Sequence, residues 1–137
     1  MSGGGFAINN PGNLRYISTD PWNGQVGNHN GFGIYDTLSN GVRAMGKQLT
    51  KYYAGGKTTL TSMITTYAPS TENDTAAYIS DVSVRTNIPA DQTLVWPAAQ
   101  AGGEVGGDEP DVVAAMIIHE QGYNSISEGD LVAYLSS

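Results

Sequence analysis

The sequence predicts an α+β fold, mainly helical, in which a small N-terminal β-hairpin or sheet precedes about five helices. Three observations support this class. Turn-forming residues concentrate in the first 36 positions, helical spacing of apolar residues begins near Ser39, and that spacing recurs to the C-terminus. With 137 residues and 39% hydrophobic content, the chain suits one domain with a single modest core. We therefore expect one domain, residues 1–137, with a hairpin region at 1–38 and a helical region at 39–137.

The hairpin region is rich in Gly and Asn, with short aromatic runs between turn signals. Its turn signals are NPGN, DPWNG and NHNGFG, because Pro presets φ and Gly or Asn accepts a positive φ. LRYI at 14–17 and FGIYD at 32–36 have the composition of strands. These runs predict an antiparallel hairpin or a three-stranded sheet with long turns.

The helical region shows apolar residues at helical spacing in five segments. In one clear case Leu60, Met63, Ile64 and Tyr67 recur at i, i+3, i+4 and i+7, and Pro69 ends the pattern. The predicted helices lie within residues 39–53, 58–69, 70–88, 109–120 and 127–135.

Two segments before the fourth predicted helix lack this periodicity. PADQTLVW at 89–96 indicates a short turn or helix, and AAQAGGEVGGDEP at 98–110 a flexible connection within the domain. Pro110 suits the first turn of the next helix, where its missing N–H has no intrahelical partner. Asp108 and Glu109 are expected to cap that helix and to complement its dipole.

Composition excludes several classes of function. The formal net charge is −7, with six basic and 13 acidic residues, so binding of nucleic acid is not expected. We expect neither membrane insertion nor a secretory signal, because no apolar stretch spans a bilayer and the N-terminus lacks the signal pattern. The absence of Cys excludes disulfides. His29 and His119 lie far apart without metal-ligand spacing, so we expect no metal and no cofactor.

The charge is distributed unevenly along the chain. Eleven of the 13 acids lie from Glu72 onward, whereas five of the six bases lie at or before Lys57. Arg43, Lys47 and Lys51 recur every four residues and form a basic stripe on one helix face. Such a stripe is most often a solvated face, and contact with an anionic polymer is the alternative.

The stretch VAAMIIHEQGYN ends an apolar helical stripe with a carboxylate. Val113, Met116 and Ile117 lie seven, four and three positions before Glu120, so all four share one helix face. Desolvation beside this stripe and the negative end of the helix dipole both favour the protonated acid. Gly122 allows the chain to turn sharply after it. A carboxylic acid that stays protonated near neutral pH can donate a proton to a glycosidic oxygen.

Other interpretations of these residues are open. A Glu in the last turn of a helix is usually exposed or satisfied by a nearby donor. His119 points about 100° away from Glu120 around the helix, which suits packing or hydrogen bonding.

Glu72 and Asp74 form a second carboxylate cluster that can act as acid and base or hold a cation, although STEND is also typical of helix capping. A Ser/His/Asp hydrolase is not indicated, because there is no G-x-S-x-G motif.

Two stretches resemble lysozyme-superfamily peptidoglycan hydrolases, most of all the glucosaminidase group of autolysins and flagellar muramidases. The first is NNPGNLRY…WNG…GFGIYDTLSNGVRAMGKQLTKYY, which is similar to a hairpin, strand and helix of that group. The second is TYAPSTENDTAAYISDV, which is similar to a segment whose first Tyr lines the active site and falls on Tyr67. NPGN, ENDT and HE-x-G also resemble small phage-encoded virion or lysozyme-like proteins, over about residues 9–134.

The order of these motifs differs from the family. The family's catalytic helix ends in Glu-Ser-Gly-x-Gly and precedes the hairpin, whereas the matching MIIHEQGYN comes last in this chain. The resemblance therefore implies a circularly permuted lysozyme-like fold with Glu120 as general acid, Tyr67 near it in a cleft, and Asn10 and Asn13 in the hairpin. Gln121 replaces the common Ser, and no second catalytic carboxylate is evident near the hairpin. The site thus resembles single-glutamate lytic transglycosylases, whose substrates supply the C6 hydroxyl or N-acetyl group that completes the reaction.

We expect a peptidoglycan glycosidase that cleaves the β-1,4 bond between N-acetylated amino sugars, as a muramidase, glucosaminidase or lytic transglycosylase. The alternative is a non-catalytic virion or wall-binding protein with the same fold, whose partners would include other virion proteins. Either protein would belong to a phage virion, or would reach the cell wall from the host cytoplasm by an external route. The expected substrate-binding residues are Tyr67, Tyr123, Asn10, Asn13, Glu72 and Asp74.

Overall fold

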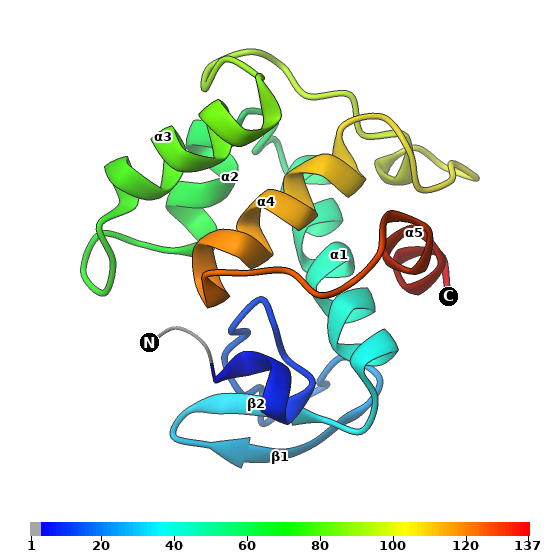
Figure 1. The fold of residues 1–137 in the computed structure, drawn as a ribbon. Helices are drawn as coiled ribbons and strands as arrows, with labels where there is room; N and C mark the ends of the chain where they lie inside the picture. The colour runs from blue at the N-terminus through cyan, green and yellow to red at the C-terminus, as the bar shows by residue number, and fades with distance from the viewer. Residues whose placement is uncertain (1–3) are drawn as a thin grey trace.

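The computed structural model describes residues 4–137, which form five α-helices and one two-stranded antiparallel sheet (Figure 1). The predicted class, mainly helical α+β, is confirmed. Residues 1–3 lie outside the described residues. They belong to the N-terminal stretch in which no secretory signal is expected. From residue 4 to the C-terminus, no helix combines the length and apolar character needed to cross a membrane. The elements are η1 (Gly5–Ile8), β1 (Gln25–His29), β2 (Phe32–Tyr35), α1 (Leu38–Ala54), α2 (Leu60–Tyr67), α3 (Thr75–Thr86), η2 (Pro97–Ala99), α4 (Glu109–Gln121) and α5 (Glu128–Ser136).

The predicted hairpin is present and is formed by β1 and β2. Asn30 and Gly31 connect the strands with φ of 53° and 91°, and two positive φ values are what a type I′ hairpin turn requires. The sequence does not predict β1, because its letters QVGNH are poor in β-branched and aromatic residues. Pairing with β2 is what holds this segment extended.

The prediction of a strand at 14–17 is wrong. This segment contributes only an isolated bridge between Arg15 and Phe32. The Gln25 side chain accepts the N–H of Ile17 at 2.9 Å and donates to its carbonyl at 2.6 Å, so a side chain takes the place of a neighbouring strand. Residues 14–17 therefore have the composition of a strand but do not pair continuously with another strand.

All five predicted helices are present, and side-chain caps set the starts of four of them. Thr37 caps α1, Asp74 caps α3 and Ser127 caps α5 by accepting a backbone N–H. Thr59 and Ser62 form a reciprocal capping box at α2. The predicted third helix is shorter than its sequence segment, because the residues before Asp74 form the α2–α3 loop.

The start of α4 differs from the prediction. Pro110 occupies the first turn as expected, but the expected capping by Asp108 and Glu109 is wrong. The Asp108 carboxylate accepts the backbone N–H of Val95 at 2.7 Å instead of one from its own helix. The Glu109 side chain turns inward and is buried. Upstream, residues 89–92 form a turn and residues 93–96 have no regular structure. The expected connection begins within η2 and continues as a loop.

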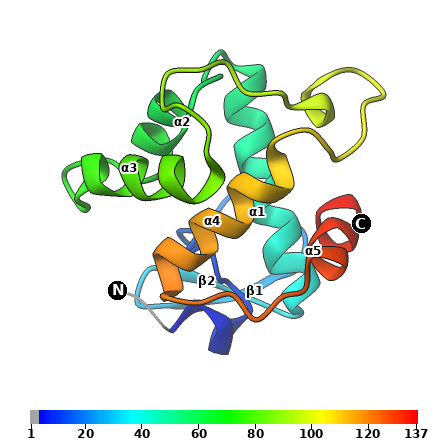
Figure 2. The same cartoon turned by 45° about the horizontal axis from the view of Figure 1, so that its top comes forward.

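Helix α1 lies at the centre of the helical region, and α4 crosses α1 (Figure 2). α3 packs along α4, α2 packs against α3, and α5 packs against α1. In both views the hairpin and η1 lie together near the C-terminal end of α4. This arrangement brings the N-terminal segment to the end of the helix that carries Glu120. Fully buried core residues include Met45, Leu49, Met63, Met116 and Ile117.

Candidate active site

A cleft of about 370 Å³ lies between the N-terminal segment and the end of α2 with the α2–α3 loop. This volume falls within the range of sites for small ligands. Gln48 and Tyr52 of α1 contribute to its wall, and Glu120 reaches it from the last turn of α4. The cleft is also lined by Asn13, Arg15, Ile17, Phe32, Tyr67 and Glu72.

Helix α4 places Glu120 at the boundary between the core and this cleft. Val113, Met116 and Ile117 on the same face are fully buried, as the spacing predicts, and Glu120 is partly buried. Gly122 ends the helix with φ of 84°, a left-handed conformation that favours glycine. The chain leaves α4 soon after the carboxylate, which keeps one side of Glu120 open to the cleft.

Both carboxylate oxygens of Glu120 accept hydrogen bonds from distant parts of the chain. Asn13 Nδ2 donates to Oε1 at 2.9 Å, and the Tyr78 hydroxyl donates to Oε2 at 2.8 Å. Burial raises the pKa of Glu120 above its ordinary value, and the bonds from Asn13 and Tyr78, with nearby His119, oppose the shift without cancelling it. Glu120 therefore keeps its proton to a higher pH than an exposed Glu, while its ionised form has two donors.

Gln121, the last residue of α4, orients Asn13 toward Glu120. Its buried side chain accepts the N–H of Gly5 at 2.9 Å and donates to the carbonyl of Pro11 at 2.8 Å. It also donates to Asn13 Oδ1 at 3.2 Å, so the NH₂ group of that amide is the one that faces Glu120. The sequence marks Gln121 only as a departure from the family's Ser, and no local pattern indicates this role.

Tyr67 lies in the cleft with its hydroxyl turned to the backbone. The hydroxyl donates to the carbonyl of Gly12 at 2.6 Å. A Cβ at Gly12 would lie 2.5 Å from that hydroxyl, so only glycine allows the contact. Burial and then the charge of Glu120 raise the pKa of Tyr67 well above its ordinary value, so the phenol stays neutral. The hydroxyl is thus engaged by the backbone, which leaves the ring of Tyr67 to line the cleft.

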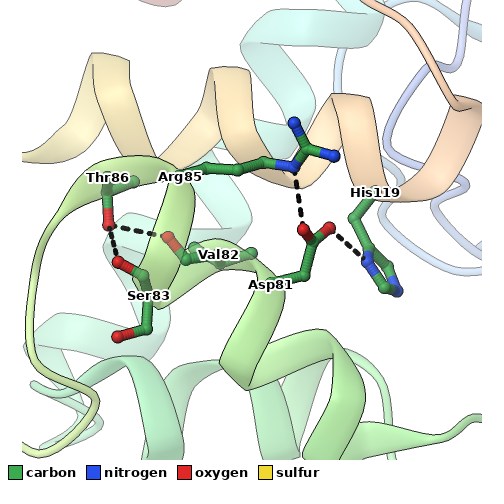
Figure 3. A network of polar contacts seen from close by, with 6 residues as sticks. All are labelled: Asp81, Val82, Ser83, Arg85, Thr86 and His119. Atoms are coloured by element: carbon green, nitrogen blue, oxygen red, sulfur yellow. Dashed lines mark hydrogen bonds and ion pairs between the residues drawn. The ribbon is translucent and has the colours of Figure 1, made fainter.

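Tyr78 is supported by a polar network between α3 and α4. The ring of His119 stacks on Tyr78 with centroids 3.9 Å apart. Asp81 lies between Arg85 Nε, at 2.9 Å, and His119 Nδ1, at 2.8 Å (Figure 3). Partial burial acts to raise the pKa of Asp81, but hydrogen bonds from His119 and Arg85 outweigh it and lower the pKa. Ionised Asp81 can only accept hydrogen bonds, so His119 Nδ1 carries the proton that is shared with it. His119 thus has the packing and hydrogen-bonding role that its place in the sequence favours.

Asn10 and Tyr123, both expected to bind substrate, are not among the residues that line the cleft. Asn10 is fully buried, and its amide donates to the carbonyls of Leu14 and Gly33 and accepts the N–H of Leu14. It therefore holds the N-terminal segment against β2. Tyr123 is exposed and stacks on Phe6 with ring centroids 4.9 Å apart.

Glu72 and Asp74 have separate roles. Asp74 accepts the N–H of Ala77 at 3.1 Å at the start of α3, which confirms the capping interpretation, and it does not line the cleft. Glu72 lines the cleft and pairs with Arg15 at 2.6 Å. Within residues 4–137, no group of three or more His, Asp or Glu side chains is arranged to hold a metal ion.

No protein-family model matches the chain, and no curated protein matches it. The resemblance to lysozyme-superfamily hydrolases therefore depends on short motifs. What the site can do chemically follows from its geometry, which combines a desolvated carboxyl, two side-chain donors to it and an open cleft.

Tyr78→Phe is expected to change the pH dependence of any activity that needs protonated Glu120. The Tyr78 hydroxyl lowers the pKa of Glu120, so its loss raises that pKa and moves the alkaline limb of the pH–rate profile to higher pH. The variant should also lose about 1–3 kcal/mol of unfolding free energy, measurable in urea. Tyr53→Phe is the control, because its hydroxyl bonds the Leu94 carbonyl at 2.7 Å outside the cleft. An alkaline limb that moves equally in both variants would contradict the prediction.

Proposed function

We propose that this protein cleaves glycan strands of bacterial peptidoglycan with Glu120 as the general acid. The observation that carries the proposal is the partly buried carboxyl of Glu120, whose pKa is raised by burial, at the wall of an open cleft. A glycosidic oxygen needs such a proton donor in order to leave. The rings of Tyr52 and Tyr67 and the amide of Gln48 line the same cleft and suit the faces and acetamido groups of amino sugars.

The proposed reaction begins with the glycosidic oxygen within hydrogen-bond reach of Glu120. Transfer of the Glu120 proton to that oxygen breaks its bond to the anomeric carbon and leaves an oxocarbenium-like centre. Asn13 and Tyr78 already point at the carboxylate that forms, so its charge develops next to two donors. The carboxylate then takes a proton from the nucleophile, either water or a hydroxyl of the substrate, as that nucleophile attacks the anomeric carbon.

The nucleophile is proposed to come from outside the protein, because the cleft offers no second unpaired carboxylate. Of the described residues that line it, Glu120 and Glu72 are the carboxylates, and Glu72 is bound to Arg15. Glycosidases that use two carboxylates place the second one across the bond that breaks. The arrangement therefore favours single-glutamate chemistry of the lytic transglycosylase type.

Digestion of purified peptidoglycan, followed by mass spectrometry of the released muropeptides, tests the proposal. We expect strand cleavage with anhydro-sugar ends, the product of attack by the C6 hydroxyl. Reducing ends would instead assign that step to water. Absence of both products, on material that a known muramidase digests, would overturn the proposal. Binding to the same material without cleavage would favour the alternative, a non-catalytic wall-binding protein.

A further inference from the structure

A second cavity, of about 510 Å³, adjoins the cleft. Ile17 and Gln48 line both, so the two share part of their walls. Helix α1 forms one side of the second cavity, and residues 19–23, with the partly buried ring of Trp22, form the other. The cleft therefore has a side chamber on the α1 side of the N-terminal segment.

Three cations give this side chamber its charge. Arg43, Lys47 and Lys51 share one face of α1 and all line the chamber, and Lys47 and Lys51 are exposed, as the solvated face favoured by the sequence requires, so the basic stripe forms one wall of an open chamber. Asp20 is the carboxylate among the residues that line it. Among residues 4–137, no Asp or Glu side chain lies within ion-pair distance of the three cations. Arg43 is already engaged, since its Nε donates to the main-chain oxygen of Ser137 at 2.9 Å, which leaves Lys47 and Lys51 as the cations that can bind a ligand. The chain as a whole carries −7, so this chamber is a local exception.

Two adjacent rows of side chains on helix α1 line the cleft and the side chamber, respectively. Gln48 and Tyr52, four residues apart, line the cleft. Arg43, Lys47 and Lys51 lie on the neighbouring row, about 100° around the helix from it, and line the side chamber. A ligand that lies in the cleft and carries an anionic branch can contact both rows at once.

We propose that the side chamber binds the acidic peptide stem that branches from the glycan strand, through the carboxylates of that peptide. This inference rests on the proposed function, since a strand in the cleft carries such peptides on its lactyl-bearing sugars. The branch has to leave the cleft sideways, and an adjoining cationic chamber stabilises its charge there. Lys47 and Lys51 supply ammonium donors, and the ring of Trp22 supplies an apolar surface for the peptide.

Binding of the free stem peptide, released from peptidoglycan by an amidase, tests the chamber apart from cleavage. By calorimetry, Lys51→Gln should bind the peptide about 5-fold more weakly than the wild type, and Lys47→Gln/Lys51→Gln about 30-fold more weakly. Lys51→Gln is included alone because Lys47 also acts on the buried Glu109. Lys57→Gln is the matched control, since it removes an exposed Lys outside the chamber and should bind like the wild type. Binding should weaken as the salt concentration rises.

The ratio of kcat/KM for peptide-bearing strands to that for strands stripped of peptide gives a second measurement. It should exceed one in the wild type and in Lys57→Gln, and fall toward one in Lys47→Gln/Lys51→Gln. Equal peptide binding by the wild type and this double variant, or no binding by either, would overturn the chamber's role even where strands are cleaved. Lysine-dependent peptide binding without strand cleavage would support the chamber and overturn the catalytic proposal. A glycerol phosphate polymer that binds more tightly than the peptide would overturn the assignment to the stem.

Discussion

Glu120→Gln is expected to lower the rate of strand cleavage by about 10²- to 10⁴-fold, the contribution typical of a general acid. Gln has nearly the same shape as Glu but no acidic proton, so the glycosidic oxygen would have to leave without one. Its amide oxygen can accept from Asn13 while its NH₂ donates to the Tyr78 hydroxyl, which can also accept, so the variant should keep its stability to within about 1 kcal/mol. Loss of turbidity of purified peptidoglycan, with both proteins at equal concentration, measures the change in rate.

The matched control for this prediction is Glu72→Gln, which neutralises the other carboxylate of the cleft. Glu72 is half-exposed and paired with Arg15, and such surface pairs contribute about 0–1 kcal/mol. We expect this variant to change KM more than kcat, since Glu72 is proposed to contact substrate and not the bond that breaks. Equal clearing by the wild type and by a folded Glu120→Gln would remove Glu120 from its proposed role.

Glu109→Gln is expected to stabilise the protein at alkaline pH. Glu109 begins α4, yet it is only 2% exposed, and its Oε1 has no hydrogen-bond partner among the described residues. Desolvation raises the pKa of Glu109 from 4.5 to about 7, with the charge of Lys47 opposing the shift. Ionised Glu109 is therefore an unfavourable charge in the folded state.

The sign of the pH effect follows from proton binding. Between 4.5 and about 7 the folded state binds more protons at Glu109 than the unfolded state, so stability falls as the pH rises through this window and stays low above it. The shift corresponds to about 3 kcal/mol. Glu109→Gln lacks this titration, so it should match the wild type near about pH 5 and melt roughly 10 °C higher near about pH 8.

Circular dichroism melts at the two pH values measure this difference. Glu128→Gln is the control, because it removes the same charge from an exposed site in the first turn of α5. It should show no gain that depends on pH. A gain for Glu109→Gln that is the same at both pH values would contradict burial of the carboxyl as the cause.

The helices were predictable because each depends on interactions within a few residues. Apolar spacing and a capping side chain lie in the same short segment, as Thr59 and Ser62 illustrate for α2. The strand at 14–17 was predicted wrongly because a strand also needs a partner, and the partner of Ile17 is the Gln25 side chain. Glu109 has the local chemistry of a cap, but burial against the core determines where its side chain lies.

The sequence by itself determined that Glu120 ends a buried stripe and that Gly122 turns the chain there, because helical periodicity specifies which face is buried. Only the tertiary structure decided what surrounds this carboxyl. Asn13 lies 107 positions from Glu120 in the chain, Tyr78 lies 42 away, and Gln121 bonds a backbone N–H 116 positions distant. Periodicity shows that a face is covered without showing which segment covers it, so these contacts appear only once the N-terminal segment before the hairpin and α3 have packed against α4.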